Sequence, residues 1–282
     1  AVGSTGSVNF LIIGFCMGVC NGFAIPLAHK FGAGDYKGMR GFMMNAIYLS
    51  AIFAVVMTIM TVIFCMPILE LMRTPENIID GAYRYIVIIF WGIPVTYLYN
   101  LVSGIIRSMG DSRTPVVFLV IAAVINIGLD LFFIVVLGTG VEGAAWATVI
   151  SQLISCILVL WCLYKSEGSY QLRFSKLQIK GVYLKQIFQV GIPAGIQSMI
   201  INFSNVLLQS SVNSFGSTAM AGYTAANNIL GFLYAAVNSI TQACMSFTSQ
   251  NYGVGKYKRM DKVLIDCLIL TVVVAGLLGC GS

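Results

Sequence analysis

Long, largely apolar stretches follow one another along the whole chain and set the strongest limit on its fold. About 20 apolar residues make one membrane-spanning helix, and eight stretches of that order fit into the 282 residues. Only 9% of the residues are charged, against about 25% in soluble domains, which excludes soluble enzymes, disordered tails and secreted disulfide scaffolds. The sequence therefore predicts an all-α polytopic membrane protein, with spans near 8–28, 42–67, 85–106, 114–137, 143–164, 186–212, 219–249 and 263–282.

Basic residues give the predicted spans a direction. Of the 16 Lys and Arg, 14 lie on alternate loops, and Arg73 and Arg84 lie on the others. Because Lys and Arg accumulate in cytoplasmic loops, we expect the basic side to face the cytoplasm and the protein to lie in the cell (inner) membrane. This distribution explains the net charge of +6 without nucleic acid, and no nucleic-acid partner is expected.

A short internal repeat predicts how the helices are grouped. Residues 31–39 match residues 252–260 at an offset of 221, with five of nine positions identical. Six predicted spans separate the copies, and this even number gives both copies the same orientation, as in parallel transporter repeats. We therefore expect two six-helix lobes in a twelve-span protein, of which about eight helices are present in this chain.

The repeat also predicts the domain boundaries. Residues 1–165 are expected to form the amino-terminal lobe, as helices 2–6 of the twelve, and residues 186–282 to begin the carboxy-terminal lobe, as helices 7–9. The polar, basic residues 166–185 between them are expected to form a cytoplasmic inter-lobe loop. The glycines of both repeat copies predict a helix-ending turn with left-handed backbone at the membrane surface.

One carboxylate lies deep inside a predicted span. Asp130 is about seven residues, ~10 Å, from the outer end of its helix, and a charge at such a depth marks an ion or proton pathway. Asn126 lies one turn away on the same face, and a short connection brings Thr148 of the next helix to a similar depth. The three residues predict a cation-coupling site for Na⁺ or H⁺; the structural alternative is a protonated or locally paired Asp130.

Other polar side chains within the predicted spans have two interpretations. They line a substrate cleft, or they form hydrogen bonds between neighbouring helices, and the sequence supports both equally. These residues are Gln197, Asn202 and Asn205 on the sixth span and Tyr97 and Asn100 on the third.

Several motifs together resemble the multidrug and toxic compound extrusion (MATE) transporters over essentially the whole chain. They are GAGDY at 32–36 with its echo at Gly253, RSMGDSRTP at 107–115, NxxxD at 126–130 and GIPAG at 191–195. The resemblance implies two six-helix lobes around a central cleft, and it assigns Asn126, Asp130 and Thr148 to the amino-lobe cation site. The family site also uses an Asp on its first helix, which this chain lacks, so we expect an incomplete site.

The resemblance implies a secondary antiporter rather than an enzyme. We expect it to export small organic compounds, often cationic or aromatic, in exchange for Na⁺ or H⁺, as a monomer in membrane lipid without a cofactor. The alternative is a lipid-linked oligosaccharide flippase of a related fold, which needs a basic cleft, whereas no Lys or Arg lies in the middle of a predicted span. An intramembrane enzyme needs a second catalytic group, and the single His29 excludes a two-histidine zinc motif.

Overall fold

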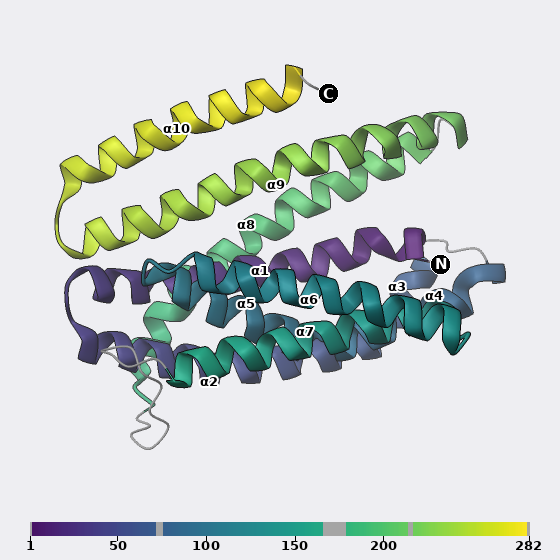
Figure 1. Ribbon diagram of the computed structural model, residues 1–282, viewed down its shortest axis with the longest axis horizontal. Helices are drawn as coiled ribbons and strands as arrows, with labels where there is room; N and C mark the ends of the chain where they lie inside the picture. Colours follow the sequence, from purple (N-terminus) through teal and green to yellow (C-terminus); the bar gives the residue numbers. More distant parts are fainter. Residues whose placement is uncertain (1, 72–75, 166–178, 214–216, 281–282) are drawn as a thin grey trace.

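The computed structural model describes residues 2–71, 76–165, 179–213 and 217–280, and these residues are almost entirely helical. Figure 1 shows α8 crossing α1, with α9 and α10 on one side of the bundle that the earlier helices form. The described part of the chain contains α1 (Val2–Gly32), α2 (Tyr36–Ile63), α3 (Cys65–Leu71), α4 (Glu76–Trp91), α5 (Ile93–Ser108), α6 (Arg113–Leu131), the π-helical turn η1 (Phe132–Val136), α7 (Gly140–Lys165), α8 (Gly181–Asn213), α9 (Ser217–Gly253) and α10 (Tyr257–Cys280).

Each predicted span coincides with a long helix or with a pair of helices. Among the described residues, α1, α2, α6 with η1, α7 and α10 are long and apolar enough to cross a membrane, and α4 with α5 forms one further span bent by 43°. The more polar α8 and α9, with 33 and 37 residues, occupy the sixth and seventh predicted spans. The prediction of an all-α polytopic membrane protein is confirmed.

The predicted inter-lobe loop falls mostly on residues 166–178, which lie outside the described residues. Its last residues, from Gly181 onward, are the first turn of α8. The start of α8 is fixed to α2, because the Lys180 amide donates to Asn45 Oδ1 over 3.1 Å. The Tyr183 ring also packs against the ring of Phe42, with 4.5 Å between the centroids.

Helix α1 is the element around which the others pack. It contacts α2, α4, α5, α8 and α9, and 56% of its most apolar segment is buried inside the protein. Its side chains Val19, Phe23 and Leu27 are fully buried. By contrast, α6 and α10 expose many Val, Leu and Ile side chains, as expected for helices that face lipid acyl chains.

Small residues let α8 approach α1 closely. Gly14, Gly18 and Gly22 recur at four-residue intervals along one face of α1, and α8 packs against this face. A Cβ at Gly22 would lie 2.5 Å from the Cα of Gly191, so there is no room for a side chain at this crossing. Since lipid tails are as apolar as Leu, such close packing is one of the main forces that hold membrane helices together.

The internal repeat is visible in the backbone at the ends of α1 and α9. Gly34 and Gly255, which are equivalent in the repeat, have φ angles of +72° and +73°. After Gly34, the amide of Asp35 donates to the carbonyl of Lys30 over 3.0 Å, and the equivalent pair closes α9 at the same distance. This pattern is a Schellman motif, and it confirms the predicted left-handed turn in both copies.

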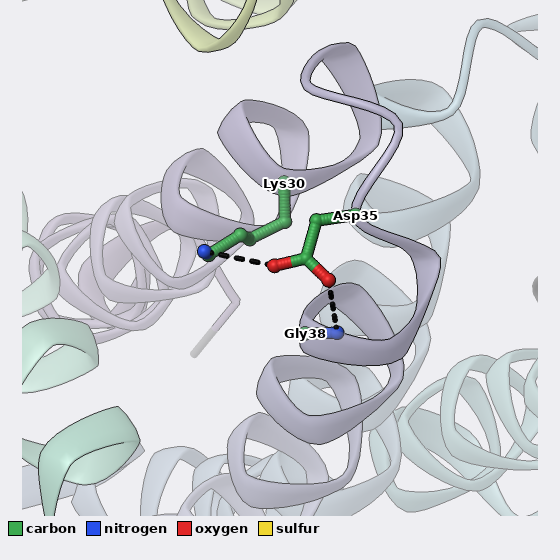
Figure 2. Close-up of polar contacts among 3 residues, drawn as sticks. All are labelled: Lys30, Asp35 and Gly38. Carbon is green, nitrogen blue, oxygen red and sulfur yellow. Dashed lines mark hydrogen bonds and ion pairs between the residues drawn. The ribbon is translucent and has the colours of Figure 1, made fainter.

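The two copies differ in how the following helix begins. Before α2, Asp35 Oδ1 accepts a hydrogen bond from the Gly38 amide, and Asp35 Oδ2 pairs with Lys30 Nζ, both over 2.9 Å (Figure 2). Lys256 takes the equivalent place before α10, and its ammonium group cannot accept such a bond. The bond from the Gly38 amide, followed by the bond from Lys30, lowers the pKa of the Asp35 carboxyl below its ordinary value.

We predict that Asp35→Ala destabilises the protein by about 1 kcal/mol, because it removes the side-chain cap of α2. Asp35→Asn is the matched control. The amide oxygen of Asn still accepts the capping hydrogen bond, and the variant loses only the exposed ion pair with Lys30, which contributes little. Thermal unfolding of the purified protein in detergent at neutral pH measures the difference. Equal loss of stability in both variants would contradict the capping role.

The lowered pKa of Asp35 also predicts a dependence on pH. A carboxyl group whose pKa is lower in the folded state stabilises that state above its unfolded pKa, about 3.9. This contribution is lost as the pH falls through the lowered folded value. The stability advantage of wild type over Asp35→Ala should therefore shrink below about pH 4, as the same unfolding measurement at acidic pH would record.

Candidate functional site

Asp130 and Asn126 lie one turn apart on the same face of α6, and both are half-buried. Asp130 Oδ1 and Asn126 Nδ2 are buried atoms, and neither has a hydrogen-bond partner among the residues that the structure describes. Buried polar atoms are nearly always paired, and a carboxylate inside a membrane costs roughly 2.5 to 3.5 kcal/mol on insertion scales. Packing alone does not explain why this helix carries the pair.

The register between α6 and α7 places Thr148 near this pair. A Cβ at Gly143 would lie 2.8 Å from the Cβ of Phe133, and Ser155 Oγ donates to the carbonyl of Phe118 over 3.0 Å. Counting along the antiparallel helices between these two contacts puts Thr148 at about the level of Asn126. It is therefore about one turn deeper than Asp130.

Thr148 is exposed, and its hydroxyl donates to the carbonyl of Ala144 within α7 over 2.9 Å. Within the described ranges, no hydrogen bond joins Thr148 to Asn126 or Asp130. The bond to Ala144 uses the hydroxyl proton and leaves oxygen lone pairs free to bind a cation.

Two residues that the sequence analysis did not single out lie in the same region. Gln152 follows Thr148 by one turn on α7, and its Oε1 is another buried atom without a partner in the described part of the chain. Tyr85 of α4 interacts electrostatically with the Asp130 carboxylate. Next to Tyr85, Arg84 forms an ion pair with Glu142 over 3.2 Å, which joins α4 to α7. Polar groups of α4, α6 and α7 thus occur in this part of the bundle.

A π-helical turn begins two residues after Asp130. The turn η1 continues α6 beyond Leu131, and the hydroxyl of Thr139 donates to the carbonyl of Phe133 over 2.7 Å. Turns of this kind are frequent at functional sites, because the extra residue changes the direction of the side chains around it.

A metal at this site would have one carboxylate ligand. No three His, Cys, Asp or Glu side chains within the described residues are close enough to hold a metal ion together. Neutral oxygens such as those of Asn126 and Thr148 would have to complete the coordination of Na⁺ at Asp130. Carboxylate, carbonyl and hydroxyl oxygens suit hard cations of this kind.

The five other polar residues that the sequence analysis singled out lie in different places in the structure. Tyr97 and Asn100 line a small cavity between α1 and α5, where the Tyr97 hydroxyl is buried and has no partner in the described ranges. Gln197 and Asn205 are exposed on α8. Asn202 faces α1, where a Cβ at Gly14 would meet its side chain, and it donates to the Ser198 carbonyl over 2.8 Å.

Long apolar helices, with buried polar atoms that no described residue pairs with, define a polytopic membrane protein. The MatE family model matches residues 1–132 and 193–280. The chain belongs to this family, the MATE transporters, which are transport proteins and not enzymes. It is a multi-pass protein of the bacterial cell membrane.

Relatives from several bacteria match almost the whole chain. It is 29% identical to the probable multidrug resistance protein YoeA of Bacillus subtilis, over 99% of this chain and 62% of that protein. It is 32% identical to YpnP of the same organism, over 92% and 58%, and 24% identical to the FAD transporter of Shewanella oneidensis, over 99% and 62%. The chain thus spans about three fifths of the length of these relatives.

Solved structures show the same fold. A MATE protein in complex with MaD5 has a TM-score of 0.88 and 24% identity, and it aligns with 97% of this chain over 62% of its own. A multidrug resistance MATE transporter in its outward-facing conformation has a TM-score of 0.86 and 23% identity, with 96% of this chain and 61% of its own aligned. At this identity the likeness concerns the fold alone.

We predict that Asp130→Asn leaves the unfolding temperature unchanged or raises it, because the substitution removes the charge of a half-buried carboxyl group whose Oδ1 has no partner in the described part of the chain. Tyr99→Phe is the contrast, since the buried Tyr99 hydroxyl donates to the Pro115 carbonyl over 3.1 Å. Loss of that bond should cost about 1 kcal/mol. Thermal unfolding in detergent compares the two. An equally large loss in Asp130→Asn would make Asp130 a structural residue.

Proposed function

We propose that the protein is a secondary antiporter that exports small organic compounds in exchange for Na⁺ or H⁺, with Asp130 as the coupling carboxylate. The observation that carries the proposal is the buried Asp130 oxygen, which has no hydrogen-bond partner among the described residues and lies one turn from Asn126 in a largely apolar helix. A site of this kind binds a cation because the cation supplies the partner that the protein does not.

In this proposal Asn126 and Thr148 provide neutral oxygens beside the carboxylate, and Gln152 lies one turn further inside. A bound proton neutralises Asp130 directly, whereas Na⁺ needs several of these oxygens to replace its water ligands. Either event lowers the charge inside the bundle, and a cation that binds one packing of the helices better than another shifts the population toward it. The two halves of the chain then rock between states that open to opposite sides of the membrane.

The substrate class is proposed from the relatives and from the helices. YoeA and YpnP are named as probable multidrug resistance proteins, which supports export of varied small organic compounds, often cationic or aromatic. The polar residues of α8 and those of the α1–α5 cavity are proposed to contact such compounds: Gln197, Asn202, Asn205, Tyr97 and Asn100. We propose that the protein works as a monomer, because the rocking takes place within one chain.

Efflux of a fluorescent cationic dye from cells that express the protein at its full natural length tests this proposal. Wild type should export the dye, and Asp130→Asn should reduce export at least tenfold, because the coupling charge is lost. Asp266→Asn is the matched control, since it makes the same change at an exposed carboxylate of α10 and should leave export unchanged.

Independent control of the Na⁺ and pH gradients identifies the coupling ion. If Na⁺ couples, collapse of the Na⁺ gradient alone stops wild-type efflux, and the same reasoning applies to a proton gradient. Export by Asp130→Asn at the wild-type rate, or wild-type export that persists without both gradients, would contradict the proposal.

A further inference from the structure

Helices α1 and α9 meet at their carboxyl ends, on the basic side of the bundle. Figure 1 shows these two ends close together, while the helices diverge toward their other ends. Lys30 lies in the last turn of α1 and Lys37 just beyond it, and Lys256 and Lys258 follow the end of α9. The contact therefore joins the early helices to α9 at the surface that is expected to face the cytoplasm.

The contact is built twice, once from each copy of the repeat. A Cβ on Gly32 would overlap the carbonyl of Gln250 and lie 2.8 Å from its Cα, and a Cβ on Gly253 would overlap the carbonyl of His29 and lie 3.0 Å from its Cα. The two glycines are 221 residues apart, and so are His29 and Gln250. The two halves are thus reciprocal, and each glycine faces the backbone of the other helix.

Side chains next to the glycines reinforce the crossing. The His29 ring packs against the ring of Tyr252, with 4.8 Å between the centroids. Gln250 Nε2 donates over 2.6 Å to the carbonyl of Ser108, which is the last residue of α5 and has no partner within its own helix. The end of α9 is therefore fixed to both α1 and α5.

A small cavity lined by both polar and apolar residues lies one to three turns inside this crossing. Its lining includes Asn21 and Ala28 of α1, Arg107 of α5, and Gln242, Ser246 and Ser249 of α9. Ser249 is only 5% exposed. Polar groups from both halves of the chain thus line one cavity next to the two helix ends.

We propose that Gly32 and Gly253 form a reciprocal clasp that closes the two halves of the protein at the basic end, and that this clasp must open before the cavity can reach the cytoplasm. The clasp depends on backbone contact at both glycines, so any Cβ at either position separates the helices. Its role in transport rests on the proposed antiport, whereas the contact itself does not.

Distances between two spin labels test the clasp. Labels carried by non-natural amino acids at positions 37 and 258, both exposed and just beyond the helix ends, leave the native cysteines in place. Pulsed electron spin resonance on the full-length protein should give a short distance in wild type. Gly32→Ala and Gly253→Ala should each move most of the population to distances several ångströms longer. The double variant should differ little from either single variant, because both contacts belong to one crossing.

Gly231→Ala and Gly128→Ala are the matched controls, because nothing lies within 4 Å of a Cβ at either position. Both should keep the wild-type distance. A second measurement detects opening of the clasp without labels at the helix ends. A membrane-impermeant thiol reagent is added to Ser249→Cys, and peptide mass spectrometry measures how fast position 249 is modified. This rate should rise at least tenfold when Gly32→Ala is added.

Wild-type distances and an unchanged modification rate in folded Gly32→Ala and Gly253→Ala would overturn the clasp. Monodisperse protein with a wild-type unfolding temperature establishes that the variants are folded. Neither readout depends on transport, so failure of the antiport proposal and failure of the clasp are distinguishable.

Discussion

Close packing of helix backbones at glycines is the constraint on which the rest of this structure depends. In lipid there is no hydrophobic force between helices, so contact energy comes from van der Waals packing and from interhelical hydrogen bonds. Helix α1 uses Gly14, Gly18 and Gly22 against α8 and Gly32 against α9. These contacts allow one helix to touch both the early and the late part of the chain.

The region around Asp130 is packed differently from the helix crossings of α1. The crossings of α1 leave no space, whereas α6 and α7 carry polar atoms that no described residue satisfies, among them Asp130 Oδ1 and Gln152 Oε1. Helix α5 connects the two regions physically. Its Tyr99 hydroxyl bonds to Pro115 near the start of α6, and its last carbonyl accepts the bond from Gln250 of α9. A change in packing around α6 therefore has a continuous route of contacts to the clasp.

Much of the fold follows from the sequence, because hydropathy predicts the spans and the repeat predicts the turns that end two of them. The eight predicted spans correspond to helices, and the turns at Gly34 and Gly255 have the predicted left-handed backbone. The close approach at Gly32 and Gly253 was not predictable, because glycines at a helix crossing have the same local sequence pattern as glycines in a turn. Only the spatial proximity of Gln250 and His29 distinguishes them.

The candidate site was predictable only in part, for a similar reason. Spacing along one helix identifies Asn126 beside Asp130, but it does not fix the register between helices. Gln152 was missed because it lies one turn beyond Thr148 on α7. Tyr85 was missed because it lies on α4, 45 residues before Asp130 in the sequence. Polar residues inside apolar spans were the available signal, and for Gln152 the four-residue spacing from Thr148 was a second one.

The most direct test of the account joins its two regions in one measurement. The distance between spin labels at positions 37 and 258 would be recorded in the full-length protein at high and low Na⁺ and at high and low pH. The account predicts that one of these cations shifts the distance distribution in wild type and that Asp130→Asn abolishes the shift. A distribution that responds equally in wild type and Asp130→Asn, or in neither, would contradict the claim that cation binding at Asp130 controls the packing of the two halves.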